Sequence, residues 1–246
     1  NELRKLIEKP KLGINRIVWN FRLTPQSSIQ LNVSKPGRYG EATKGPLALP
    51  GNYSVSMHKV VDRTPTLLVD KTPFSCVWLD ELSTPTENKE DLLAFQVKVD
   101  KLRKAVDASG KVLNDLNKRL NFIESAIKSY PNLDLNKLKY IHSLNSLSDS
   151  LSIQLYGDPS LSKRDIEQQE SISSRVGIII WNMWRSRSNP TETNKMLYNS
   201  AGEDFTLLVP EINKFDKGVK DLENYLEDNQ VHYTPGRSLI IDWKMD

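Results

Sequence analysis

A heptad repeat of apolar residues extends from Leu92 to Tyr130. Its steps alternate between three and four residues, and Ser109 is the only position of the series that is not apolar. Such a repeat places its members on one stripe of a helix, which must be buried against other helices. The apolar positions are Leu92, Phe95, Val99, Leu102, Val106, Leu113, Leu116, Leu120, Ile123, Ile127 and Tyr130. We therefore expect a helix roughly 60 Å long.

Two residues affect the geometry and the end of this first helix. Gly110 costs about 1 kcal/mol in a helix interior, and we interpret it as a local bend. Pro131 disfavours helical geometry for the residue before it, so the helix should end near Tyr130.

Three further segments show helical periodicity. The first covers 135–156, with inward positions predicted at Tyr140, Leu144, Leu147, Leu151 and Leu155. The second covers 165–187 and is predicted to bury Ile166, Val176, Ile180 and Trp184. The last repeats apolar residues at Phe205, Leu208, Ile212, Phe215, Val219, Leu222 and Leu226, and Pro210 inside it predicts a kink or a break. Short loops between such helices predict an up-and-down, antiparallel bundle over 87–229.

The residues before this bundle have strand character. Residues 14–22 alternate, and residues 52–57 repeat that period with Tyr53, Val55 and Met57 expected to face inward. Residues 66–70 and 74–78 are two more short apolar runs. Several short strands between turn signals predict a small immunoglobulin- or fibronectin-like β-sandwich over 13–84.

The fold class that follows is α+β, a small sandwich with a long helical bundle. We expect 1–12 to be a linker from an upstream region, because the chain begins at Asn1 rather than Met. Residues 230–246 are expected to form an extended tail with a strand near 238–243. This tail could return to the sandwich, and the bundle would then be an insertion before a final strand. Arg237 in the tail could anchor a carboxylate, but we favour a role in attaching the tail to the bundle.

Composition narrows the class of partner. The 34 basic and 31 acidic residues are spread along the chain, so no strong field favours nucleic acid or a membrane surface. No apolar run approaches the roughly 20 residues that span a bilayer. Cys76 is the single cysteine, which excludes an intrachain disulfide, and we interpret it as a small buried hydrophobe.

The histidines and acidic residues that could act in catalysis or bind metal are scattered along the sequence. His58, His142 and His232 have no second ligand at metal-site spacing, and the adjacent pair Asp80-Glu81 is better explained as a solvated loop than as a glycosidase pair. We therefore predict no catalytic, cofactor-binding or metal-binding residues, and no cofactor.

One cluster stands out as a contact site. Trp181, Trp184, Arg185 and Arg187 lie near one helix end, where tryptophan with arginine could contact a protein partner or a glycan. Packing against the sandwich is the alternative that we favour for these side chains.

Three segments resemble a known family. Gly13-Ile14-Asn15-Arg16-Ile17-Val18-Trp19-Asn20-Phe21-Arg22 resembles the strand that follows the propellers of bacterial sortilin-like, BNR-repeat proteins. A turn and strand of that family is similar to Gly45-Pro46-Leu47-Ala48-Leu49-Pro50-Gly51-Asn52-Tyr53-Ser54-Val55. The C-terminal end of the family's sequences resembles Tyr233-Thr234-Pro235-Gly236-Arg237 followed by Trp243. One departure is Asp70-Lys71-Thr72-Pro73, where members often have Asp-Pro-Arg.

The resemblance implies the C-terminal part of an exported protein, periplasmic, cell-surface or extracellular. Such proteins are often labelled glycosyl hydrolases, and any sugar chemistry would belong to propellers upstream of this chain. The leading hypothesis is a non-catalytic accessory or scaffolding module that binds a protein partner in a cell-envelope or surface complex through an exposed helix face. The alternatives are a carbohydrate-binding or support domain of a glycan-processing enzyme, and a self-associating coiled coil.

Overall fold

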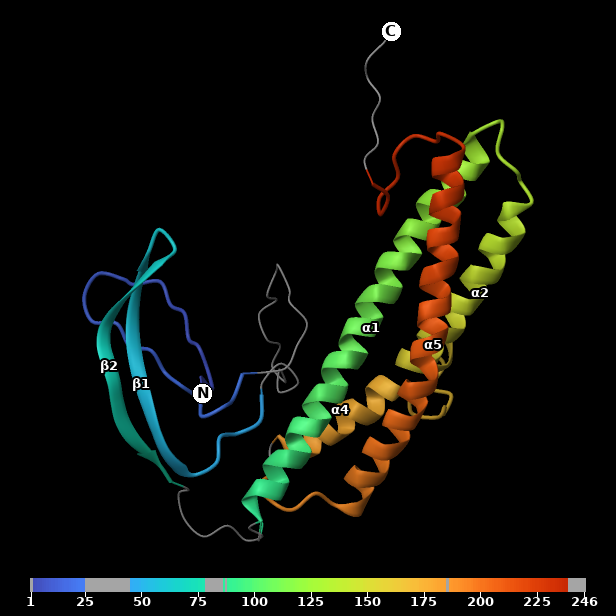
Figure 1. Cartoon of the computed structure of the whole chain (residues 1–246). Helices are drawn as coiled ribbons and strands as arrows, with labels where there is room; N and C mark the ends of the chain where they lie inside the picture. Colours follow the sequence, from blue (N-terminus) through green and yellow to red (C-terminus); the bar gives the residue numbers. More distant parts are fainter. Residues whose placement is uncertain (1, 25–44, 78–85, 87, 185, 239–246) are drawn as a thin grey trace. The chain divides into compact units, whose positions relative to one another are not determined.

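The computed structural model describes residues 2–24, 45–77, 86, 88–184 and 186–238. Its elements are two strands, β1 (Gly51–Val61) and β2 (Thr64–Cys76), and five helices. The helices are α1 (Lys89–Ser129), α2 (Lys137–Tyr156), α3 (Pro159–Ser162), α4 (Ile172–Met183) and α5 (Glu192–Asp228). The chain is therefore of the mixed α+β class (Figure 1).

The chain divides into two compact units. One contains the described residues up to 100 together with 180–191, and the other contains 101–179 and 192–238. The division falls within α1 and α4, so each of these helices contributes residues to both units.

The long helix predicted by the heptad repeat is confirmed as α1. Its predicted positions Val99, Val106, Leu113, Leu120 and Ile127 are each almost completely buried. Gly110 does not interrupt α1, which is helical throughout, and the local bend stays a prediction. A Cβ at residue 110 would lie 1.5 Å from the Tyr156 hydroxyl, so glycine is there because α2 places that side chain against the helix.

Side-chain contacts define the directions of the long helices in the second unit. On α1 and α5, Arg119 pairs with Glu223, and farther along the chain Tyr130 contacts His232, just beyond α5. Both positions increase together, so α1 and α5 run parallel. Helix α2 runs antiparallel to α1, because its Ser148 donates to Asn117 whereas its later residue Tyr156 lies against the earlier Gly110.

The simple up-and-down order was therefore wrong for the last helix. The reason is that α2 and α4 are short, at 20 and 12 residues, against 41 and 37 for α1 and α5. The Arg175 guanidinium of α4 donates to Ser200 and pairs with Asp204, so α4 packs on the first part of α5. The two intervening helices were predicted, but their lengths and the direction of α5 relative to α1 were not.

Several detailed predictions need correction. Tyr140 and Ile166 are exposed rather than inward, and Ile141 takes the buried position on α2. Helix α5 continues through Pro210, so the break is wrong, and the kink stays a prediction. Pro210 is exposed, so the Thr206 carbonyl that loses its helical donor faces the solvent side of the helix, where water can supply one.

The strand region differs more from the prediction. Within the described residues, 14–20 form no strand, and only Arg22 makes an isolated bridge, to Leu47. The two runs at 66–70 and 74–76 belong to one strand, β2, which pairs antiparallel with β1. Asp62 and Arg63 join the strands with φ values of 48° and 65°, the left-handed geometry of a tight hairpin turn. The described residues thus show a two-stranded sheet, and they do not show a full sandwich.

The tail also has a defined place as far as Ser238. Val231 and Thr234 are buried, and residues 231–238 belong to the same unit as α5. The final strand predicted near 238–243 lies, except for Ser238, outside the described residues.

The glycines of α5 give a direct test of this packing. A Cβ on Gly218 would lie 2.7 Å from Leu144 Cδ2 and 2.9 Å from the Tyr140 hydroxyl, whereas Gly202 has nothing within 4 Å. We expect Gly218→Ala to destabilise the chain by about 1–3 kcal/mol through overpacking. The control Gly202→Ala should stabilise it by about 1 kcal/mol through helix propensity. Urea unfolding measures both, and a Gly218→Ala variant more stable than the parent would contradict the α2–α5 contact.

Candidate functional site

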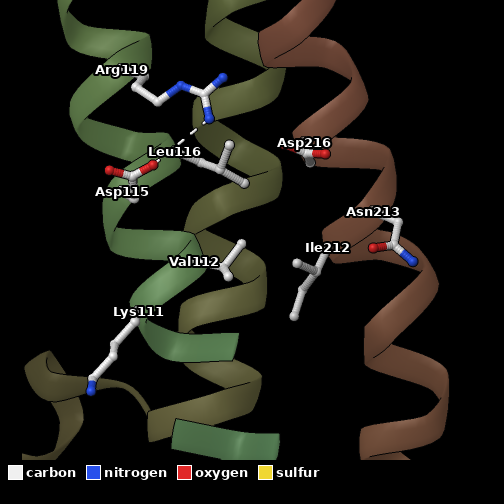
Figure 2. A pocket seen from close by; sticks show the side chains of 8 residues that line it. All are labelled: Lys111, Val112, Asp115, Leu116, Arg119, Ile212, Asn213 and Asp216. Atoms are coloured by element: carbon white, nitrogen blue, oxygen red, sulfur yellow. Dashed lines mark ion pairs between the residues drawn. The ribbon is translucent and has the colours of Figure 1, made fainter. Parts of the chain in front are cut away.

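A shallow groove lies between α1 and α5 and encloses about 480 Å³. Figure 2 shows its lining, polar side chains over an apolar floor. The residues are Lys111, Val112, Asp115, Leu116, Arg119, Ile212, Asn213 and Asp216. A groove of this size could hold a small ligand, so the state of its charged side chains decides what chemistry it offers.

Arg119 and Asp216 of this groove each form an ion pair with a neighbouring residue. Arg119 donates to Glu223 through Nε at 2.7 Å and Nη2 at 2.5 Å, and its Nη1 lies 3.7 Å from an Asp115 oxygen. Asp216 accepts from Lys220. The hydrogen bond to Glu223 raises the pKa of Arg119, although partial burial lowers it. A two-pronged bond to a carboxylate that is 7% exposed fixes the guanidinium in place, and we assign this pair a structural role.

The tail covers the Arg119–Glu223 pair. A Cβ on Gly236, whose φ is 98°, would lie 2.3 Å from Arg119 Nε and 2.8 Å from a Glu223 oxygen. Next to it, the Arg237 guanidinium donates to the carbonyls of Val231 and His232 and lies 3.6 Å from Glu227 of α5. Arg237 therefore attaches the tail to the bundle, the role favoured from the sequence.

The four predicted contact residues lie in different environments. Trp184 is 1% exposed, so no ligand reaches its ring in this structure. Trp181 is 45% exposed, and Arg187 is half-buried. Arg185 lies outside the described residues. Contact with a partner or a glycan therefore stays a prediction for Trp181 and Arg187.

Trp184 is held by its backbone as well as by packing. Its carbonyl accepts from Arg22 Nη2 at 3.0 Å, and the Met183 carbonyl accepts from Gln96 Nε2 at 3.0 Å. Both carbonyls belong to the last turn of α4, which lacks helical donors and attracts positive charge. The cluster thus anchors a helix end. No sequence pattern indicated Arg22 or Gln96, because their partners lie 162 and 87 residues away.

The small cavity beside this helix end encloses about 20 Å³. It is lined by Leu47, Ala48, Leu49, Leu92, Gln96, Ser186 and Arg187. That volume holds about one water molecule. It is too small for a sugar or a peptide side chain.

The remaining chemical candidates do not converge. His58 is on β1, His142 on α2, and His232 on the tail against Tyr130. In the part of the chain that the structure describes, no group of three His, Cys, Asp or Glu residues could hold a metal ion. The pair Asp80-Glu81 lies outside that part. Among the same residues, no helix combines the length and apolarity needed to cross a membrane.

The hairpin β1–β2 is an exposed apolar surface. Seven of its large side chains are between 45% and 62% exposed: Val55, Met57, Val60, Val61, Leu67, Leu68 and Val69. We call this set the hairpin surface. Only at its base do aromatic rings pack together, where Trp19 lies edge-on to Tyr53 at 5.8 Å and to Phe74 at 6.1 Å. Burial raises the pKa of Tyr53, whose hydroxyl donates to the Leu49 carbonyl.

The sequence analysis assigned part of this surface to a buried face. The alternation of Tyr53, Val55 and Met57 predicted that the three side chains point inward from one side of a strand. It carried no information about whether anything covers that side. Tyr53 is half-buried, but Val55 and Met57 are exposed.

The two outer edges of the hairpin differ. β2 contains Pro65 and Pro73, which have no N–H to donate. It also has two bulges: it advances three residues from Thr72 to Val69 while β1 advances two, and two residues from Val69 to Leu67 while β1 advances one. Proline and bulges are the features that close a sheet edge to further strands. β1 has no proline, and both extra residues lie on β2, so β1 has the more regular edge.

Comparison with known proteins yields no relative. No family model, no curated protein and no solved structure matches the chain.

The Arg119–Glu223 pair provides a stability test. Removing a largely buried partner leaves a desolvated charge, so we expect Glu223→Gln to destabilise the chain by about 2–4 kcal/mol. The control Asp216→Asn removes a more exposed pair with Lys220 and should cost about 0.5 kcal/mol or less. Urea unfolding at neutral pH measures the difference. Equal effects of the two substitutions would contradict a structural role for Arg119.

Proposed function

We propose that this chain is a non-catalytic interaction module whose β1–β2 hairpin binds a protein partner. The observation that carries the proposal is the hairpin surface, seven large apolar side chains at least 45% exposed on one pair of strands. Exposed apolar groups of this number on adjacent strands mark sites of protein association. The helix face favoured from the sequence is therefore replaced, as the proposed contact, by the hairpin.

Strand physics supports this choice. A two-stranded hairpin is at best marginally stable in water, because one ladder of hydrogen bonds and a half-exposed face do not offset the ordering of the chain. β1 and β2 comprise 11 and 13 residues, and in each only one or two positions are even half-buried. A partner strand or a second layer would satisfy backbone groups and cover apolar side chains.

The paired charges of the bundle support a non-catalytic role. Catalysis needs a group whose proton or lone pair is available to a substrate. In the α1–α5 groove, Arg119 is bound to Glu223 and Asp115, and Asp216 to Lys220. These contacts make the groove a stable surface of the bundle.

The wider setting of the module is part of the same proposal. The resemblance of its motifs to sortilin-like, BNR-repeat proteins supports an exported or cell-surface parent protein. We propose that the β-sandwich predicted over 13–84 is complete only in the bound state, when the partner adds strands to the β1–β2 sheet.

Glycan binding is the second candidate, and Trp181 favours it. An indole ring that is 45% exposed can stack on a sugar ring. Binding of the chain to a glycan array, lost in Trp181→Ala, would support this alternative. Trp184 cannot serve the purpose while it is buried.

A photocrosslinking experiment in the source cells tests the proposal. A photoreactive amino acid at Leu68, which is 57% exposed on β2, should give a discrete crosslinked product containing one defined protein. The same amino acid at Ile153, which is 45% exposed on α2, is the matched control and should give none. Leu68 products that are absent, or that match those from Ile153, would contradict binding through the hairpin.

A further inference from the structure

We propose that the occupant of the β1 edge is a second copy of this chain, joined to the first as an antiparallel β1–β1 pair about a twofold axis at Ser56. The inference rests on the proposed function and specifies its partner. It starts from three features of the hairpin, namely the difference between its edges, the sequence of β1 and the position of its apolar face.

Of the two outer edges of the hairpin, only that of β1 is suited to pairing with a further strand. Pro65 and Pro73 each lie in a register pair with β1, opposite Val60 and Ser54. A proline in such a sheet is tolerated where its missing N–H would have pointed away from the neighbouring strand, so the outer edge of β2 lacks two donors. The two bulges further distort that edge. In the described chain β1 pairs with β2 alone, and its outer edge can accept another strand.

The sequence of β1 is complementary to itself in reverse. An antiparallel pair about Ser56 places Val55 opposite the copy's Met57 and Ser54 opposite the copy's His58. It also places Tyr53 opposite the copy's Lys59, where the ammonium can lie against the ring. No charged residue faces a like charge in this register. Because the contact is twofold, each favourable pair occurs twice.

The apolar face would continue across the joined sheet. Alternation along β1 puts Val55 and Met57 on the face of Tyr53, and Val69 of β2 pairs with Met57. In the order β2–β1–β1–β2, these side chains of the two copies form one continuous apolar band across four strands. Three or more strands with such a face reach the size at which a sheet is stable in water, which the single hairpin does not.

Sedimentation equilibrium of the full chain tests the dimer. The monomer mass is 28.1 kDa, and we expect twice that value. Val55→Lys should weaken association by about tenfold or more, because the introduced charge would be desolvated against the copy's Met57. Ile153→Lys is the control, since Ile153 is 45% exposed but lies on α2, outside the hairpin surface. It should leave association unchanged.

A charge-swap pair tests the register. Val55→Lys and Met57→Glu should each weaken the dimer, and the double variant should recover most of the association, because each introduced lysine then faces an introduced glutamate across the axis. Val55 and Met57 are both at least half exposed, so none of these variants should lower the melting temperature of the bundle. Failure of the double variant to recover would overturn the Ser56 register.

The outcomes separate this inference from the proposed function. A chain that sediments at 28.1 kDa at every accessible concentration overturns the dimer. If the Leu68 photocrosslink then contains a different protein, the hairpin still functions as an interaction surface. A dimer that dissociates with Leu68→Lys but not with Val55→Lys would place the contact on β2 and also overturn the inference.

Discussion

Burial of the α1 seam is the constraint on which the second unit depends. A helix of 41 residues with an apolar stripe along its length cannot remain alone in water, and in this unit α2 and α5 pack against α1. The polar contacts of the unit are arranged around this seam. The Ser148–Asn117 bond fixes α2 against α1, and the Arg119–Glu223 pair fixes α5. The tail then adds Gly236 over that pair.

Helices of this kind can be predicted from sequence, because their apolar period and their end signals lie in the same segment of chain. The period of Leu113, Leu120 and Ile127 and the Pro131 stop were enough to define α1 almost to the residue. What the period did not predict depends on distant residues. The close approach of Tyr156 to Gly110 was not predicted, because nothing near Gly110 in the sequence revealed it. Likewise, the parallel arrangement of α1 and α5 follows from the lengths of the intervening helices rather than from their stripes.

The candidate sites were much less predictable. Trp184 and Arg187 drew attention as aromatic and basic neighbours, yet Trp184 is buried at a helix end whose carbonyls bind Gln96 and Arg22. The hairpin surface includes Val55 and Met57, which an alternating pattern had assigned to a buried face. Alternation defines the two sides of a strand, but only the tertiary structure shows whether one side is covered. Both the anchored helix end and the open hairpin are therefore results of long-range structure.

The central claim is that the bundle is stable by itself while the hairpin depends on a partner. Amide hydrogen exchange on the dilute monomeric chain tests it most directly, because exchange reports the local free energy of opening for each segment. We predict that amides of α1 from Val106 to Ile127 exchange only through global unfolding, and that amides of β1 and β2 exchange orders of magnitude faster. Hairpin amides as strongly protected as those of α1 would show a sheet that is already complete, and would contradict this account.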